Sequence, residues 1–238
     1  MSEWLVELGS SDDDIQGLAR LFTSAECSIV AHEDRYFLSS VRFQSLTTPN
    51  KVLDAAERLV ECVNAVGLLT LEIITPFTLG GVWQMTDTGH LCRQRATPSI
   101  HSVELSWSDG MEEPLMDPQA TAKLARLQLE DEDVRDVMEL WARCPLDWFT
   151  LKKIGEILSD AVDGYDEISN RGWANKADLK LLHDTAQDYQ AIGVRAARHA
   201  RFSKRSKPLE NPMAISDARE IARIIVVKWL VSRVENGE

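Results

Sequence analysis

The sequence lacks the features of secreted, membrane-spanning and zinc-binding proteins. It contains only four cysteines in 238 residues, and no two of them form a CxxC pair. Because a structural zinc site needs closely spaced ligands, we expect free thiols in a reducing cytoplasm. The longest apolar run near the C-terminus covers only residues 224–227, far too few to span a bilayer. The N-terminus shows no cationic segment followed by an apolar run, so we expect no signal peptide and no membrane partner.

Sequence motifs of catalysis are missing as well. There is no GxSxG, no HExxH and no Walker loop, and Gly80-Gly81 lacks the GK[ST] ending of a phosphate loop. The acidic runs at 12–14 and 130–133 open predicted helices, where carboxylates cap the N-terminus and complement the helix dipole. Three histidines fall in predicted turns or at strand ends with no metal-binding spacing: His32, His90 and His101. We therefore expect neither a metal site nor a cofactor.

The chain is acidic, with a net charge of -12. A chain of this charge is not expected to bind nucleic acids in general, because the phosphate backbone would repel it. One segment departs from this balance. Residues 195–207, here called the basic stretch, hold six Lys or Arg and one His among thirteen residues. Any contact with nucleic acid is therefore expected only through the basic stretch.

Residues 1–112 show the two-residue hydrophobic period of strands, interrupted twice by the longer period of helices. In the first strand, Trp4, Val6 and Leu8 alternate with polar Glu3 and Glu7, which predicts a half-buried strand. Helices are expected at about 13–23 and from Asn50, as N-cap, to about 64–67. Strands are expected at about 4–8, 27–31, 35–43, 69–73, 80–86, 91–95 and 103–107. This order predicts an α+β domain with an antiparallel sheet and two helices on one face.

Residues 108–118 are polar and turn-rich, and only helical patterns follow them. This change of period predicts a domain boundary, with a sheet domain at 1–112 and a helical domain at 117–238. Residues 164–175 are predicted to form a loop within the helical domain. Helices are expected at about 117–129, 130–144, 148–162, 179–186, 189–201 and from Ser216 onward. About six helices with apolar stripes predict an antiparallel bundle.

The basic stretch offers one candidate for chemistry. Arg195 and His199 are four residues apart on a predicted helix, with Arg198 beside them. Arginine binds phosphate oxygens through its forked donors, and a neighbouring histidine can move protons near neutral pH. Two structural interpretations compete with this one. The cations can complement a helix C-terminus, or pair with the chain's own acidic runs at 130–133 and 156–167.

The segment ARHARFSKRSKPLENPMAISDAREIARIIVVKWL resembles the C-terminal signature of a widespread family of uncharacterised bacterial proteins. In that family an Ala-Arg-His segment, a variable loop, a Pro-Met pair and a helix ending in tryptophan recur. PLDWFTLKKIGEIL resembles the Asp-Trp helix of the family, and WLVEL, RYFLSSVRF and residues 51–64 resemble its N-terminal half. The resemblance covers most of the chain but implies no activity.

The helical domain also resembles HEPN domains, all-α modules of bacterial toxins and antiviral systems. HEPN ribonucleases carry an arginine, a polar neighbour and a later histidine. Arg198 and His199 match the first two positions, but the expected histidine positions hold Ser203, Lys204 and Arg205. The departure removes the group that would transfer the proton. The resemblance therefore implies a HEPN-like domain used for pairing or for binding an anionic partner, in an antiviral system.

These observations favour a cytoplasmic, non-catalytic binding or assembly protein. The N-terminal sheet or the helical bundle is expected to dock a protein partner or a second copy of the chain. The basic stretch is expected to contact an acidic surface or a phosphate. The alternative is a HEPN-like ribonuclease that acts through Arg195, Arg198 and His199. Six residues are predicted to bind the partner: Arg198, His199, Arg201, Lys204, Arg205 and Lys207.

Overall fold

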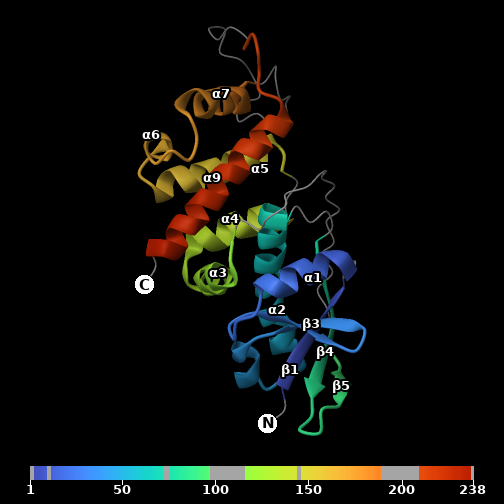
Figure 1. Cartoon of the computed structure of the whole chain (residues 1–238). Coiled ribbons are helices and arrows are strands. Elements are labelled where there is room, and N and C mark those ends of the chain that lie inside the picture. Colours follow the sequence, from blue (N-terminus) through green and yellow to red (C-terminus); the bar gives the residue numbers. More distant parts are fainter. Residues whose placement is uncertain are drawn as a thin grey trace. The chain divides into compact units, whose positions relative to one another are not determined.

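The computed structural model describes residues 3–9, 12–71, 76–96, 116–143, 146–188 and 209–236. The chain forms two compact units, Met1–Arg143 (unit 1) and Cys144–Glu238 (unit 2), and each is described by itself. Unit 1 holds a five-stranded antiparallel sheet with helices, and the described part of unit 2 is helical, so the expected α+β class is confirmed (Figure 1). The expected boundary lay at 112–117, whereas the units divide after Arg143.

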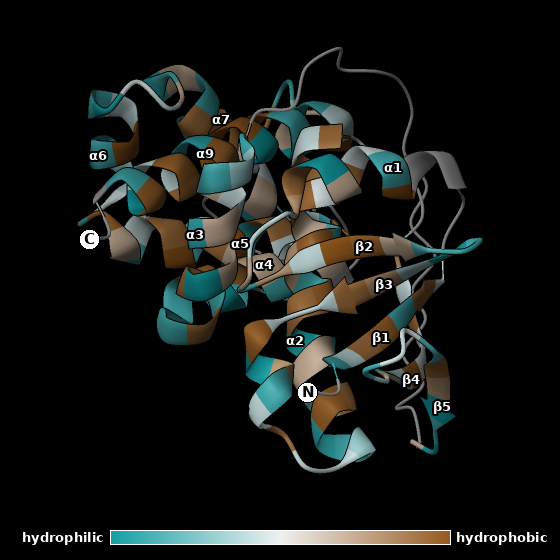
Figure 2. Cartoon of the chain, turned by 60° about the horizontal axis from the view of Figure 1, so that its bottom comes forward, coloured by the Kyte–Doolittle hydropathy of each residue, from teal (hydrophilic) through white to brown (hydrophobic). Residues whose placement is uncertain are grey.

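The sheet of unit 1 has the strand order β2-β3-β1-β4-β5, and every neighbouring pair is antiparallel. The central strand β1 buries Trp4, Val6 and Leu8, as their alternation predicts, but it also buries Leu5, whose side chain lies on the other face of the sheet. Helix α2 packs against β1 and β4, and α1 packs against β2. Figure 2 shows the hydrophilic turn that joins β2 to β3. The strands are β1 (Glu3–Gly9), β2 (Ser28–His32), β3 (Arg35–Ser39), β4 (Thr78–Met85) and β5 (Leu91–Gln94).

The third predicted strand is shorter than expected, since β3 ends at Ser39 and a 3-10 helix, η1 (Val41–Ser45), follows. Ser40 caps this helix, because its hydroxyl accepts a hydrogen bond of 3.2 Å from the Arg42 N–H. Phe43 is fully buried in η1. A buried phenylalanine fits a strand as well as a 3-10 helix, so the sequence pattern did not distinguish the predicted strand from η1.

The long helix of unit 1, α2 (Pro49–Val66), also differs from its prediction at both ends. Its N-cap is Thr48 instead of Asn50, and Pro49 occupies the first helical position, where its missing N–H has no cost. Beyond Val66 the chain continues as a π-helix, η2 (Gly67–Leu71), so the strand predicted at 69–73 is wrong over residues 69–71. The Thr70 hydroxyl donates to the Val66 carbonyl at 2.6 Å, which continues the helical path.

Two further helices complete unit 1 beside α1 (Asp12–Leu21) and α2. Helix α4 buries the apolar stripe Val134, Val137, Met138 and Trp141, and it packs against α2 and α3. This packing explains why the units divide after Arg143 and not before α3. The two helices are α3 (Pro118–Glu130), capped by Asp117 as predicted, and α4 (Glu132–Arg143).

In unit 2, α5 packs against α6, α7 and α9. The apolar pattern of the last helix predicts that it buries Ala218, Ile221, Ala222, Ile225 and Trp229. All of these are buried except Ile221, which is half-buried. The segment 164–175, expected to be a loop, contains the short helix α6. The strand predicted at 103–107 and the helix predicted at 189–201 lie outside the described residues. The helices are α5 (Trp148–Ala161), α6 (Tyr165–Asn170), α7 (Lys176–Gln187) and α9 (Ile215–Asn236).

Candidate functional site

The residues predicted to act in binding or catalysis all lie outside the described part of the chain. The structure therefore neither places nor brings together Arg195, Arg198, His199, Arg201, Lys204, Arg205 and Lys207. What it does describe is the chain on both sides of them. The last described residue before the basic stretch is Asp188, and the first one after it is Leu209.

These two flanking residues are joined to each other. The Leu209 N–H donates a hydrogen bond of 2.9 Å to the carboxylate of Asp188, the C-cap residue of α7. Bonds to a charged acceptor are stronger than those between neutral groups. The described residues on the two sides of 189–208 therefore meet at one place in unit 2, at the end of α7.

A second contact supports the same junction. The Thr185 hydroxyl accepts a hydrogen bond of 3.0 Å from the Met213 N–H. Thr185 is only 1% exposed, so this bond is shielded from water and fixes the return of the chain toward α9. Asp188 and Thr185 thus hold the two ends of the segment with side-chain oxygens from the end of α7.

The charge of this segment is opposite to that of its unit. Residues 189–208 contain six cations and no carboxylate. The rest of unit 2 carries 14 acidic and 9 basic residues. The described residues that flank this segment, Asp188 and Leu209, contact each other at the end of α7.

Some carboxylates of the acidic runs at 130–133 and 156–167 form ion pairs within their own units. Asp166 pairs with Lys176 at 2.7 Å, and Glu167 accepts a hydrogen bond of 2.9 Å from Arg171. In unit 1, Glu130 lies within 3.9 Å of Arg42, and Glu132 lies within 3.9 Å of Arg135. Each of these four carboxylates has a cation of its own unit nearby, and pairing of the basic stretch with the acidic runs stays a prediction.

The described histidines and thiols form no metal site. Within the described ranges, no group of three or more His, Cys, Asp or Glu side chains is placed to hold a metal ion. His183 of α7 stacks edge-on against Tyr165 at 5.6 Å, a structural contact between α7 and α6. Burial raises the pKa of the Cys27 thiol to about 12, so this thiol stays protonated and unreactive at neutral pH.

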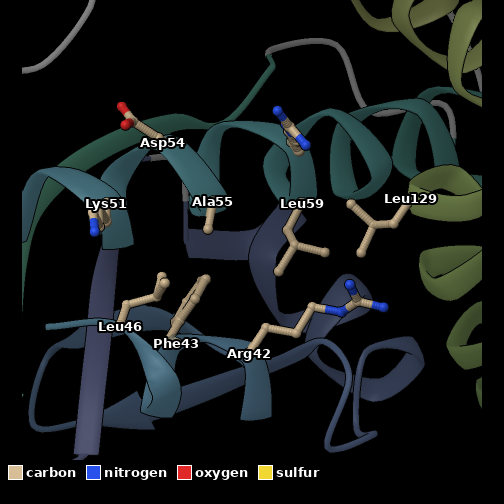
Figure 3. A pocket seen from close by; sticks show the side chains of 9 residues that line it. Arg42, Phe43, Leu46, Lys51, Asp54, Ala55, Leu59 and Leu129 are labelled. Atoms are coloured by element: carbon tan, nitrogen blue, oxygen red, sulfur yellow. The ribbon is translucent and has the colours of Figure 1, made fainter.

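Unit 1 contains a cavity that the sequence did not predict. It lies between η1 and α2, has a volume of about 320 Å³, and is also lined by Leu129 (Figure 3). Three cations line it, namely Arg42, Lys51 and Arg58. Lys51 and Arg58 are seven residues apart on α2, a spacing that places them on one face of the helix. The sequence alone could therefore have indicated two of the three cations of this cavity. Arg42 comes from η1, which the pattern had predicted as strand.

Among the described residues, no helix combines the length and the apolar character needed to cross a membrane. No known protein family, curated protein or solved structure matches the chain.

Proposed function

We propose that the protein is a non-catalytic binding or assembly protein that uses the basic stretch to engage an acidic partner or a phosphate. The observation that carries this proposal is the hydrogen bond between Leu209 and Asp188, which joins the two ends of a segment with six cations. A concentrated positive segment on an acidic chain favours association with an anionic surface, because opposite potentials steer the two together.

The setting of this function is proposed from the resemblances. A HEPN-like helical domain in a bacterial antiviral system would place the protein in the cytoplasm. Its partner would be another protein or a second copy of the chain, and nucleic acid would be reached only through residues 195–207.

Charge reversal tests the proposal directly. Arg201, Lys204, Arg205 and Lys207 are changed together to Glu in the full chain. Binding of fluorescent polyglutamate and of a labelled single-stranded RNA is followed by anisotropy. We expect affinity for an anionic probe to fall more than about tenfold, because four attractive charges become repulsive. The melting temperature should stay nearly unchanged.

A matched control reverses four exposed lysines of the described part of unit 2: Lys153, Lys176, Lys180 and Lys228. Both variants change the net charge equally, so only a local site separates them. Equal loss of binding in both would show a general charge effect and overturn the proposal. Unfolding of the first variant alone would show that the cations are structural.

The ribonuclease alternative is separated by cleavage. If the purified chain cut RNA and His199→Ala abolished the cutting without lowering the melting temperature, the binding function would be replaced by an enzymatic one. We expect intact RNA at high protein concentration. Co-purification at two salt concentrations gives a second measure, because nucleic acid bound through phosphates is lost as salt rises.

A further inference from the structure

The cavity between η1 and α2 has an apolar interior. Figure 3 shows Phe43 and Leu46 facing α2 from one side, and Leu59 and Leu129 facing them from the other. Phe43 and Leu59 are buried, and Leu46 and Leu129 are half-buried, so the accessible interior is made mainly of leucine side chains. The volume of about 320 Å³ lies at the small end of the range found for small-molecule pockets.

The rim of this cavity is positive. Arg42, Lys51 and Arg58 line it, against a single carboxylate, that of Asp54. In Figure 3 the Asp54 carboxylate points away from the apolar interior. Arg42 has carboxylates of Glu26 and Glu130 at 3.5 and 3.9 Å. In the part of the chain that the structure describes, neither Lys51 nor Arg58 has an ion-pair partner.

The position of Lys51 in its helix is electrostatically unfavourable for a positive charge. It lies in the first turn of α2, next to the positive end of the helix dipole, and that turn contains no acidic residue. Positions that break a local rule are often retained for a function. A bound anion would compensate both the ammonium group and the helix terminus.

Hydrogen bonds between separate elements fix the walls of the cavity. The Trp4 indole N–H donates to the Leu46 carbonyl at 3.0 Å, which holds the end of η1 against the sheet. The Gln128 amide donates to the Arg58 carbonyl at 2.8 Å, which ties α3 to α2. The cavity is therefore preformed, and a ligand would not have to order it on binding.

We propose that this cavity binds a small organic anion with an apolar body. The apolar body would cover Leu46, Leu59 and Leu129, and its carboxylate, sulfonate or phosphate would meet the cationic rim. The site lies in unit 1 and uses no residue of the basic stretch, so it is independent of the partner binding proposed above.

The probe for the test is 8-anilinonaphthalene-1-sulfonate, an aromatic anion that fluoresces when it leaves water. We expect saturable binding at one site on the native full chain. Octanoate should displace it at least about tenfold better than octanol, because only octanoate carries the charge that the rim recognises. Equal displacement by the two competitors would overturn the proposal, and so would binding that does not saturate. This comparison needs no variant.

Two variants locate the site. Lys51→Gln with Arg58→Gln should weaken probe binding about tenfold, and Ala55→Leu should weaken it by filling the cavity while leaving the charges in place. Lys176→Gln with Lys180→Gln in unit 2 is the matched control and should have no effect. The charge-reversal variant of the basic stretch should also bind the probe normally. Normal binding by both cavity variants would overturn the proposal, whatever the outcome for the basic stretch.

Discussion

The backbone N–H of Leu209 and the carboxylate of Asp188 meet at 2.9 Å, although 20 residues separate them in the sequence. This bond and the one between Met213 and Thr185 form the described base of the segment that contains the basic stretch. Both bonds bring the described residues that flank this segment to the end of α7.

We expect Asp188→Ala to lower the free energy of unfolding by about 1–2 kcal/mol, because it removes a charged acceptor and leaves the Leu209 N–H without it. Hydrogen exchange of the Leu209 amide should become faster. Asp188→Asn keeps an acceptor oxygen and should have a smaller effect. Asp184→Ala on the same helix removes only an exposed ion pair and should change stability by less than about 0.5 kcal/mol. Unchanged exchange at Leu209 in Asp188→Ala would contradict the role of this bond.

Asn64 joins α2 to the entrance of β4 by two buried hydrogen bonds. Its side-chain oxygen accepts from the Phe77 N–H at 2.7 Å, and its amide donates to the Phe77 carbonyl at 3.1 Å. Asn64→Ala leaves both backbone groups unpaired away from water, so we expect a loss of about 2–4 kcal/mol in urea unfolding. The exposed Asn50 on the same helix provides the control, since Asn50→Ala should shift the midpoint little. Equal effects of the two substitutions would count against this account.

The described cysteines should differ sharply in reactivity. Cys27 and Cys62 are buried, and desolvation raises the pKa of both thiols, that of Cys27 to about 12. Cys92 is exposed. In a Cys144→Ser background, a disulfide reagent at pH 8 should modify one thiol of the native protein quickly and three after unfolding. Rapid modification of a second thiol in the native state would show that a buried cysteine is accessible.

The raised thiol pKa values also predict a loss of stability at alkaline pH. Burial raises the pKa of the Cys27 thiol to about 12 in the folded state, whereas the unfolded state ionises the thiol near its ordinary pKa of about 8.5. The stabilisation is therefore complete below that value and decreases as the pH rises above it. Cys27→Ala should make the urea midpoint less dependent on pH between about 9 and 11 than it is in the parent chain. A midpoint equally dependent on pH in both proteins would refute this.

Glu220 gives a prediction for acid conditions. Two hydrogen bonds from Arg223, at 2.7 and 2.9 Å, lower the pKa of its carboxyl group. Because the folded pKa is the lower one, the pair stabilises the protein above the ordinary glutamate pKa of about 4.3, and this stabilisation is lost as the pH falls below it. Since Glu220 is half-exposed, Glu220→Gln should cost less than about 1 kcal/mol at pH 7 and almost nothing at pH 3. The exposed Glu235 of the same helix supplies the control, as Glu235→Gln should show no such difference.

Local patterns in the sequence predicted most elements of the fold. The alternation of Trp4, Val6 and Leu8 predicted β1, and Asp117-Pro118 predicted the start of α3, because side-chain period and helix capping act within a few residues. The concentration of cations at 195–207 was likewise visible without coordinates. The same patterns gave wrong predictions for two short apolar segments, residues 41–45 and 69–71. Short segments of this kind fit a strand or a helical turn equally well, and only their tertiary contacts decide which of the two forms.

Long-range contacts decided the features of the fold and of the cavity that local patterns did not predict. The sequence by itself determined the element types, the acidic balance and the basic stretch, since each depends on residues that are neighbours in the chain. Only the tertiary structure placed α3 and α4 with the sheet, gathered Arg42, Arg58 and Leu129 around one cavity, and brought Leu209 to Asp188. These relationships depend on which apolar surfaces bury one another and on which backbone groups are left to be paired, and neither is encoded in any short segment of the chain.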